Sequence, residues 1–180
     1  MVIDYNKLSS NLQYIKKFND KLNKFNYGIL VNDEVITENI DWSQYKTIPI
    51  HKFATKKVGV CWDFVNYQAL WFDNNGYSID TYFLECVTDD RYDTHTFNII
   101  HVDGYHIYFE SSWSKHKGLY ISDKKNDAFH SAYDRFKEQY ATKKKDKISC
   151  YKYHTKGLDN NLSASEFISR VKETGKKISV

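Results

Sequence analysis

Apolar residues recur every three or four positions in several parts of the chain, which is the spacing of an amphipathic helix. In residues 9–26 the series ends shortly before Gly28, and its members are Leu12, Ile15, Phe18, Leu22 and Phe25. The same spacing marks residues 61–74 and 127–141, and a final helix follows the capping-box sequence that starts at Ser163. Together with a short helix beginning at Pro49, these patterns predict a chain rich in helices.

Other segments have the pattern of strands. Residues 78–88, 95–102 and 105–112 are rich in β-branched and aromatic residues. Residues 148–153 are a further strand candidate, and the loop-like segment 29–48 is expected to hold one short strand near residues 29–31. Helices that surround an antiparallel sheet define the α+β class. We therefore predict a single α+β domain over residues 1–180.

The pair Asp103-Gly104 separates two of the predicted strands and is a strong signal for a two-residue hairpin turn. With this turn, residues whose numbers sum to 207 face each other, so His95 is opposite Ser112 and Phe97 is opposite Glu110. His95 and Glu110 are then diagonal neighbours on one face of the sheet, with Cβ atoms roughly 6–8 Å apart. Their side chains are long enough to meet.

Cys61 lies at the predicted start of the helix over residues 61–74, two positions after Gly59. A helix N-terminus presents unpaired N–H groups and a partial positive charge, which favours an anion by about 0.3–1 kcal/mol. Because the thiolate is the nucleophilic form of cysteine, this position favours a reactive Cys61. The same N–H groups can hold an oxyanion that develops on a substrate carbonyl. A cysteine, a histidine and a carboxylate then supply a nucleophile, a base and a group that orients the base.

These residues carry a resemblance to a known family. Residues 57–120, about a third of the chain, resemble the core of the transglutaminase-like superfamily, a branch of the papain-like cysteine enzymes. Its pattern is a cysteine at a helix start, a histidine heading a later strand and an acidic residue in the next strand. Cys61, His95 and Glu110 match these three positions. The acidic residue is more usually Asp, so the extra methylene of Glu110 puts the exact geometry in question more than the role.

The resemblance implies a papain-like fold, with an antiparallel sheet, a helix that bears the nucleophile and flanking helices. It also implies acyl chemistry on an amide or peptide bond through an acyl-enzyme. With water as the acceptor the chain would be a cysteine peptidase or amidase, and with an amine it would be a transglutaminase-type acyltransferase. The expected partner is a protein or peptide substrate, and no cofactor or metal is expected.

A second donor for the oxyanion hole is expected upstream of Cys61. The sequence offers Tyr27, Trp42 and Gln44 as candidates without ranking them. Two other aromatic residues, Trp62 and Trp113, either line the cleft or belong to the core.

The same residues allow two other functions. An inactive protein-binding module of this fold would be marked by a broken triad, whereas the sequence shows an intact one. A metal-dependent hydrolase would use Cys61, His95, His101 and His106, but the ordinary spacing of zinc ligands is not evident. We interpret Asp63 as the acidic residue that complements the dipole in a first helical turn.

Composition sets limits around this site. Aromatic residues make up 17% of the chain and there is one proline, which argues against linkers and low-complexity tails. The net charge of +3 is too small to imply a nucleic-acid partner, and residues 143–145 are interpreted as a solvated basic loop. Three cysteines do not suggest a disulfide framework, and Cys86 and Cys150 are interpreted as core residues. With no signal-peptide pattern and no long apolar run, we expect a cytoplasmic chain, or a fragment whose signal has been removed, without a membrane partner.

Overall fold

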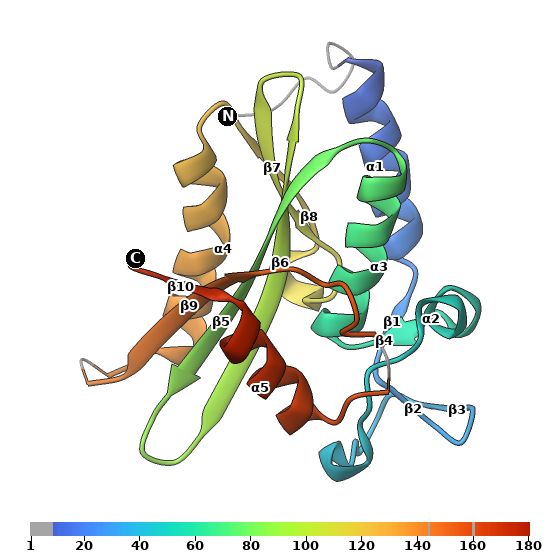
Figure 1. Cartoon of the computed structure of the whole chain (residues 1–180), viewed down its shortest axis with the longest axis vertical. Coiled ribbons are helices and arrows are strands. Elements are labelled where there is room, and N and C mark those ends of the chain that lie inside the picture. Colours follow the sequence, from blue (N-terminus) through green and yellow to red (C-terminus); the bar gives the residue numbers. More distant parts are fainter. Residues whose placement is uncertain (1–8, 144, 160) are drawn as a thin grey trace.

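The computed structural model describes residues 9–143, 145–159 and 161–180 (Figure 1). Its elements, with η marking a 3₁₀ helix, are in chain order α1 (Ser10–Leu22), β1 (Asn26–Tyr27), β2 (Ile29–Val31), β3 (Glu34–Ile36), η2 (Trp42–Gln44), α2 (Ile50–Lys56), β4 (Val58–Gly59), α3 (Cys61–Asn74), β5 (Ser78–Val87), β6 (Tyr92–Val102), β7 (Tyr105–Glu110), η3 (Ser114–His116), β8 (Gly118–Ser122), α4 (Lys125–Tyr140), β9 (Lys147–Tyr153), α5 (Ala164–Thr174) and β10 (Lys176–Ile178). Every helix that the sequence predicts is present, so the chain has the predicted α+β class.

The main sheet has six strands in the order β10-β9-β5-β6-β7-β8, and every neighbouring pair is antiparallel. The long strands β5 and β6 lie at its centre and cross the molecule in Figure 1. Two small pairs stand apart from this sheet: β2 with β3, and the parallel pair β1 with β4. The antiparallel sheet that the sequence predicts is therefore confirmed.

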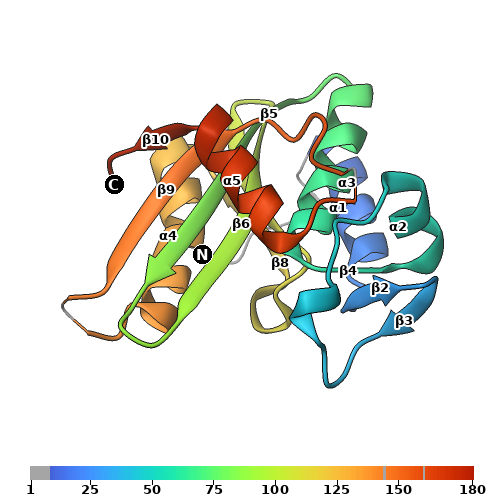
Figure 2. The ribbon, with the colours of Figure 1, turned by 60° about the horizontal axis from the view of Figure 1, so that its bottom comes forward.

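Helices cover both faces of the main sheet (Figure 2). Side chains alternate along β6, so Phe97 and Ile99 pack with Phe136 of α4 on one face, whereas Ile100 packs with Phe72 of α3 on the other. α1 joins the α3 side, and α5 packs there against β5 and β9. The central strands are buried on both faces, so residues 95–100 of β6 are all buried although His95, Thr96 and Asn98 are polar.

Several short elements were not predicted. β8 and β10 are edge strands of five and three residues, and β10 begins with two lysines. In the pairs β1–β4 and β2–β3, with strands of two or three residues, β2 is the short strand expected near residues 29–31, whereas β1, β3 and β4 were not expected. Strands this short leave no periodic pattern of their own.

Cys86 and Cys150 are buried in the layer between the sheet and α4, as expected for core residues. All three cysteines are free thiols. Burial raises the pKa of the Cys150 thiol to about 12 and also raises that of Cys86. Among the helices that the structure describes, none is long and apolar enough to cross a membrane.

Candidate active site

α3 begins at Cys61, as predicted, and the side chain of Asp63 fixes this start. Its carboxylate accepts hydrogen bonds from the backbone N–H of Val60 at 2.9 Å and of Ile48 at 2.7 Å. The hydroxyl of Tyr45 donates to the same carboxylate at 3.1 Å. Burial outweighs these bonds and raises the pKa of Asp63 to about 7. Asp63 therefore has the helix-start role expected of it and also ties α3 to the segment before α2.

Gly59 permits the close packing in front of Cys61. A Cβ atom at this position would lie 2.7 Å from the ring of Phe53 and 2.7 Å from the Cβ of Asp63. The β1–β4 pair sets Tyr27 beside Gly59, and the N–H of Gly28 donates to the Gly59 carbonyl at 3.1 Å. The segment that leads to the cysteine is therefore held from two sides.

The hairpin has the predicted register where the ladder is formed. Its recorded pairs run from Asn98 with Phe109 to Val102 with Tyr105, and their numbers sum to 207. The predicted pairs of His95 with Ser112 and of Phe97 with Glu110 are not part of this ladder. β6 continues beside β5 as far as Tyr92, whereas β7 ends at Glu110. His95 and Glu110 thus lie just past the point where the two strands stop pairing.

His95 and Glu110 form the pair that the sequence predicted. Nε2 of His95 lies 2.8 Å from Oε2 of Glu110, and both side chains are buried. An ionised carboxylate can only accept, so Nε2–H is the donor. This leaves Nδ1 of the ring for Cys61.

The chain after β7 surrounds the carboxylate of Glu110 with donors. One oxygen accepts from the N–H and hydroxyl of Ser112, at 2.8 and 2.9 Å, and from the N–H of Trp113 at 2.9 Å. The other oxygen accepts from the hydroxyl of Tyr108 at 2.7 Å as well as from His95. Burial opposes ionisation, but the charge of His95 and these donors outweigh it and lower the pKa of Glu110 to about 2.

Cys61 lies against the other side of His95. Burial disfavours the imidazolium, but the charge of Glu110 and a hydrogen bond with the Cys61 side chain outweigh it and raise the pKa of His95 to about 10. Both residues line one hollow of about 240 Å³, together with Ser112, Trp113 and Tyr140. The structure therefore brings the three predicted site residues together.

A buried polar network, which sequence reasoning did not find, fixes α3 on the sheet. The Asn98 side chain donates to the Gln68 side chain at 3.0 Å and to the Val65 carbonyl at 3.2 Å, and it accepts from Thr81 at 2.7 Å. Gln68 in turn donates to Ser111, directly after Glu110, at 2.7 Å. The only sequence signal is the presence of amide side chains in otherwise apolar segments. The network joins the cysteine helix to the strands that carry the histidine and the glutamate.

Two hollows flank Cys61. The histidine-side hollow is the one described above, to which Ser114 also contributes. The apolar hollow, of about 390 Å³, adjoins it and is lined by aromatic and aliphatic side chains with one carboxylate: Trp42, Tyr45, Val60, Trp62, Tyr92, Asp93, Ala164 and Ile168. Tyr27, Cys61 and Thr94 line both hollows, so the cysteine stands where they meet.

The three candidates for the second oxyanion donor differ in whether they line the hollows beside Cys61. Burial of its hydroxyl and the proximity of Cys61 raise the pKa of Tyr27, although 43% of the residue is exposed. Tyr27 lines both hollows beside the cysteine. Trp42 lines only the apolar hollow, and the Gln44 amide donates to the Asp41 carboxylate at 2.9 Å, outside both hollows. Tyr27 is the best placed of the three.

The two tryptophans expected near the cleft line different hollows. Trp62 is also a core residue, because its ring stacks on Phe167 with centroids 4.4 Å apart. Trp113 packs against the His95 ring with centroids 4.9 Å apart. Each therefore has both of the roles considered from the sequence.

His101 and His106 are not part of this site. Their Nδ1 atoms are 2.6 Å apart, and Nε2 of His101 lies 3.0 Å from Asp80, which also pairs with Lys125 and Lys152. His101 lies six positions after His95 along β6, a distance of roughly 20 Å. The proposed metal cluster with Cys61 is thus not formed. Among the described residues, no group of three or more His, Cys, Asp or Glu side chains is arranged to hold a metal ion.

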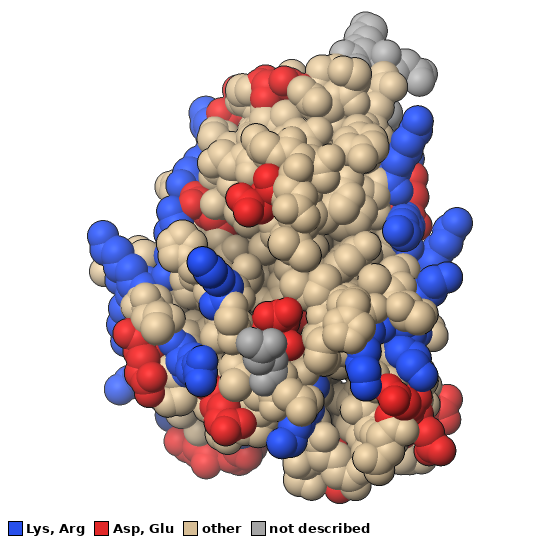
Figure 3. Space-filling view, turned by 45° about the vertical axis from the view of Figure 1, so that its right-hand side comes forward, with Lys and Arg blue, Asp and Glu red and all other residues tan. Residues whose placement is uncertain are grey.

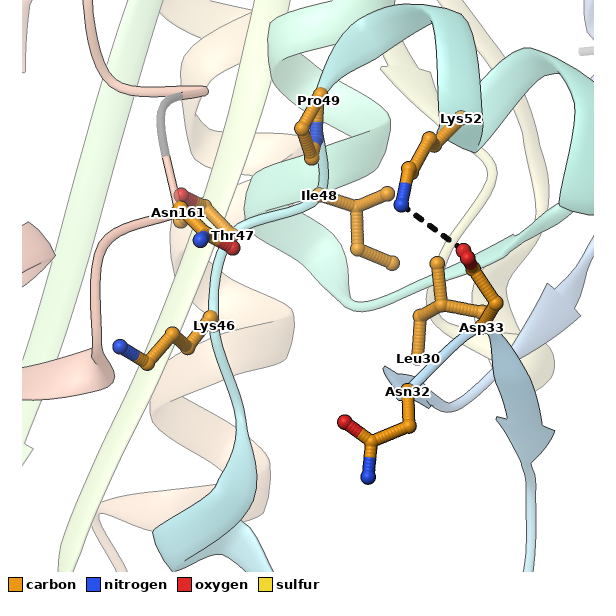
Figure 4. Close-up of a pocket in the computed structure, with 9 residues that line it drawn as sticks. All are labelled: Leu30, Asn32, Asp33, Lys46, Thr47, Ile48, Pro49, Lys52 and Asn161. Atoms are coloured by element: carbon orange, nitrogen blue, oxygen red, sulfur yellow. Dashed lines mark hydrogen bonds and ion pairs between the residues drawn. The ribbon is translucent and has the colours of Figure 1, made fainter.

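Other surface features lie apart from Cys61. The pocket in Figure 4 is lined by residues such as Lys46, Thr47 and Asn161, and its Lys52 is paired with Asp33 at 2.9 Å. On the face shown in Figure 3, basic and acidic side chains are interspersed. Of the basic run 143–145, residue 144 lies outside the described residues, and Lys145 pairs with Asp89.

Comparison of the chain with protein-family models and with curated proteins returned no match. The case for a function therefore depends on the geometry around Cys61.

Proposed function

We propose that the chain is a cysteine-dependent acyl-transfer enzyme that acts on an amide or peptide bond, with Cys61 as nucleophile, His95 as acid and base, and Glu110 as the group that orients His95. The observation that carries this proposal is the buried Glu110–His95 pair beside a cysteine at the first position of a helix. A protein or peptide is the proposed substrate.

The first step is acylation. His95 takes the thiol proton of Cys61 at Nδ1, the sulfur attacks the carbonyl carbon, a C–S bond forms and the carbonyl π electrons move onto oxygen. When the tetrahedral intermediate collapses, the C=O bond re-forms, the C–N bond breaks and the imidazolium of His95 donates that Nδ1 proton to the leaving amine. The buried carboxylate of Glu110 keeps the ring oriented and stabilises its charge, as the raised pKa of His95, about 10, indicates.

The second step releases the acyl group. Neutral His95 takes a proton from water or from an incoming amine, which attacks the thioester carbon, and the C–S bond breaks. Hydrolysis gives a free carboxylate, whereas attack by an amine gives a new amide. Both outcomes use the same three residues, so the acceptor is left open.

The oxyanion is proposed to be held by two donors. One is the backbone N–H of Cys61 at the N-terminus of α3, where the helix dipole also favours negative charge. The other is the hydroxyl of Tyr27, which is set beside Gly59 by the β1–β4 pair.

The arrangement is the one expected of a transglutaminase-like, papain-like fold. A helix starts at the nucleophile, and the histidine and the acid lie on adjacent antiparallel strands whose pairing stops just short of them. A Cys-dependent reaction needs a free thiol, which fits the three unpaired cysteines and a reducing compartment such as the cytoplasm.

The acyl-enzyme can be observed directly with p-nitrophenyl acetate, a small activated ester. We expect a burst of about one equivalent of p-nitrophenol and an acetyl adduct on Cys61 in the intact mass. Cys61→Ser and His95→Gln should abolish or greatly slow the burst, and Cys86→Ser serves as the matched cysteine control. A burst that persists in Cys61→Ser would contradict the proposal. If the acyl-enzyme forms, adding a primary amine separates hydrolysis from transfer, because only a transferase gives the amide.

A further inference from the structure

The two hollows beside Cys61 differ in chemistry, and the reaction assigns them different parts of a substrate. His95 must protonate the leaving amine, so that amine lies in the histidine-side hollow with His95, Ser112 and Trp113. The carbonyl carbon is bonded to sulfur in the same intermediate. The acyl part of the substrate leaves this carbon in another direction than the amine, and the apolar hollow is the other described space that Cys61 lines.

The apolar hollow is large enough for a bulky side chain. Its volume of about 390 Å³ falls in the range of small-molecule pockets, about 300–1,000 Å³. Three exposed aromatic residues line it: Tyr27, of which 43% is exposed, Trp42, of which 53% is exposed, and Tyr92, of which 44% is exposed. Exposed aromatic residues around a cavity are typical of a surface that binds apolar groups.

The walls of this hollow are held in place by contacts behind them. The Trp62 ring stacks on Phe167 and meets the ring of Tyr45 at 5.5 Å in an edge-to-face contact. The hydroxyl of Tyr92 donates to the buried Glu85 at 2.5 Å, so its polar end is used away from the hollow. A binding surface held in this way loses little conformational entropy when a ligand enters.

Charge narrows the class of ligand further. Asp93 is the one carboxylate among the described lining residues, and it pairs at 3.0 Å with Arg91. The described lining residues supply no Lys or Arg that could pair with an acidic ligand. An acidic side chain would lose its hydration there without a lining cation to compensate.

We propose that the apolar hollow is the acyl-side specificity pocket of this enzyme and that it selects a large apolar or aromatic side chain over an acidic one. The inference rests on the proposed function of Cys61, because it takes its orientation from the position of His95.

Peptidyl chloromethyl ketones test the pocket. In these probes the thiolate displaces chloride from the methylene carbon, and the residue next to the ketone is Phe, Leu, Ala or Asp. We expect the second-order rate of Cys61 labelling, measured by intact mass, to be at least about tenfold higher for the Phe probe than for the Asp probe. Iodoacetamide, which has no group to place in the pocket, reports the reactivity of the thiol itself.

Two charged variants on α5 form a matched pair. Ile168→Lys places a cation in the wall of the pocket and should reduce the Phe-to-Asp rate ratio at least about tenfold. Ser169→Lys places the same charge on the next residue, which is exposed and not part of the lining, and should leave the ratio unchanged.

The outcomes separate the two proposals. Equal rates for the Phe and Asp probes, or an equal effect of both lysine variants on the rate ratio, would overturn the pocket assignment. If iodoacetamide still labels Cys61 fast in that case, Cys61 remains the proposed nucleophile. If iodoacetamide labels Cys61 no faster than an ordinary thiol, the proposed function fails, and the pocket assignment fails with it.

Discussion

Glu110 shows how a single residue organises the site. It is a buried carboxylate, and five donors from His95, Tyr108, Ser112 and Trp113 converge on its two oxygens. Three of the five come from the turn directly after β7, within three residues of Glu110. The extra methylene relative to Asp therefore does not prevent the carboxylate from reaching the histidine, and it remains within reach of the turn that surrounds it.

The first prediction concerns the charge of this residue. Glu110→Gln removes the largest contribution that raises the pKa of His95, so the imidazolium that would stabilise a Cys61 thiolate is weakened and the ester is attacked more slowly. We expect the p-nitrophenol burst to slow on the order of 10²–10⁴-fold. Glu38→Gln changes an exposed carboxylate and is the control. A burst rate in Glu110→Gln close to that of the unchanged protein would show that Glu110 does not act through His95.

The second prediction concerns Tyr27. Tyr27→Phe keeps the ring but removes the hydroxyl that we assign to the oxyanion hole. We expect the burst to slow by about 10–10³-fold. Alkylation of Cys61 by iodoacetamide builds no oxyanion, so its rate should fall much less than the burst rate. Equal losses in both reactions would indicate that Tyr27 acts on the thiol and not on the oxyanion.

At the scale of elements, the sequence predicts what local patterns determine. The spacing of apolar residues locates the helices. The Asp103-Gly104 turn sets the hairpin register, in which His101 is paired with His106. No periodic pattern marks the point at which β6 and β7 stop pairing: β7 ends at Glu110, where the N–H groups of Ser112 and Trp113 turn back to the Glu110 carboxylate. The links through Gln68 and Asn98 depend in the same way on residues at least 30 positions apart meeting in the fold.

The third prediction tests the packing in front of α3. In Gly59→Ala the new Cβ would approach Phe53 and Asp63 to 2.7 Å, so one of these elements must shift. We expect the free energy of unfolding to fall by about 1–3 kcal/mol in urea denaturation. Gly104→Asn is the control, because nothing lies within 4 Å of its Cβ position and Asn tolerates the left-handed turn. A loss in Gly59→Ala no larger than in the control would contradict the close packing.

At the scale of the whole molecule, the site couples stability to pH. Glu110 has its pKa lowered from 4.5 to about 2, so its contribution to stability is present above about pH 4.5 and is lost as the pH falls towards 2. His95 has its pKa raised from 6.5 to about 10, so its contribution is present below about pH 6.5 and is lost as the pH rises through 10. The pair therefore stabilises the fold most between these limits.

The fourth prediction follows from this window. His95→Ala leaves a buried carboxylate without its partner, and we expect it to lower the free energy of unfolding by about 3–5 kcal/mol near pH 5.5. The difference from the unchanged protein should shrink below about pH 3 and above about pH 10. Urea denaturation at several pH values measures it. A difference that is constant across this range would show that the pair is not ionised in the fold.

The whole fold also sets the three cysteines apart. Cys86 and Cys150 lie under α4 with thiols whose pKa is raised by burial, whereas Cys61 lines two hollows beside His95. The sequence separates Cys61, at a helix start, from Cys86 and Cys150, which it indicates as core residues. Only the fold shows which of the three cysteines lies beside a histidine.

The most direct test of the central claim is the rate of Cys61 alkylation by iodoacetamide as a function of pH, with the labelled residue identified by peptide mass. If Cys61 and His95 form a thiolate–imidazolium pair, the rate near pH 6 stays close to its value near pH 8. In His95→Gln the rate should instead fall about tenfold per pH unit below about 8.5, as for an ordinary thiol. If Cys61 in the unchanged protein shows this same fall, or reacts no faster than Cys86 and Cys150 near pH 6, it is not an activated nucleophile.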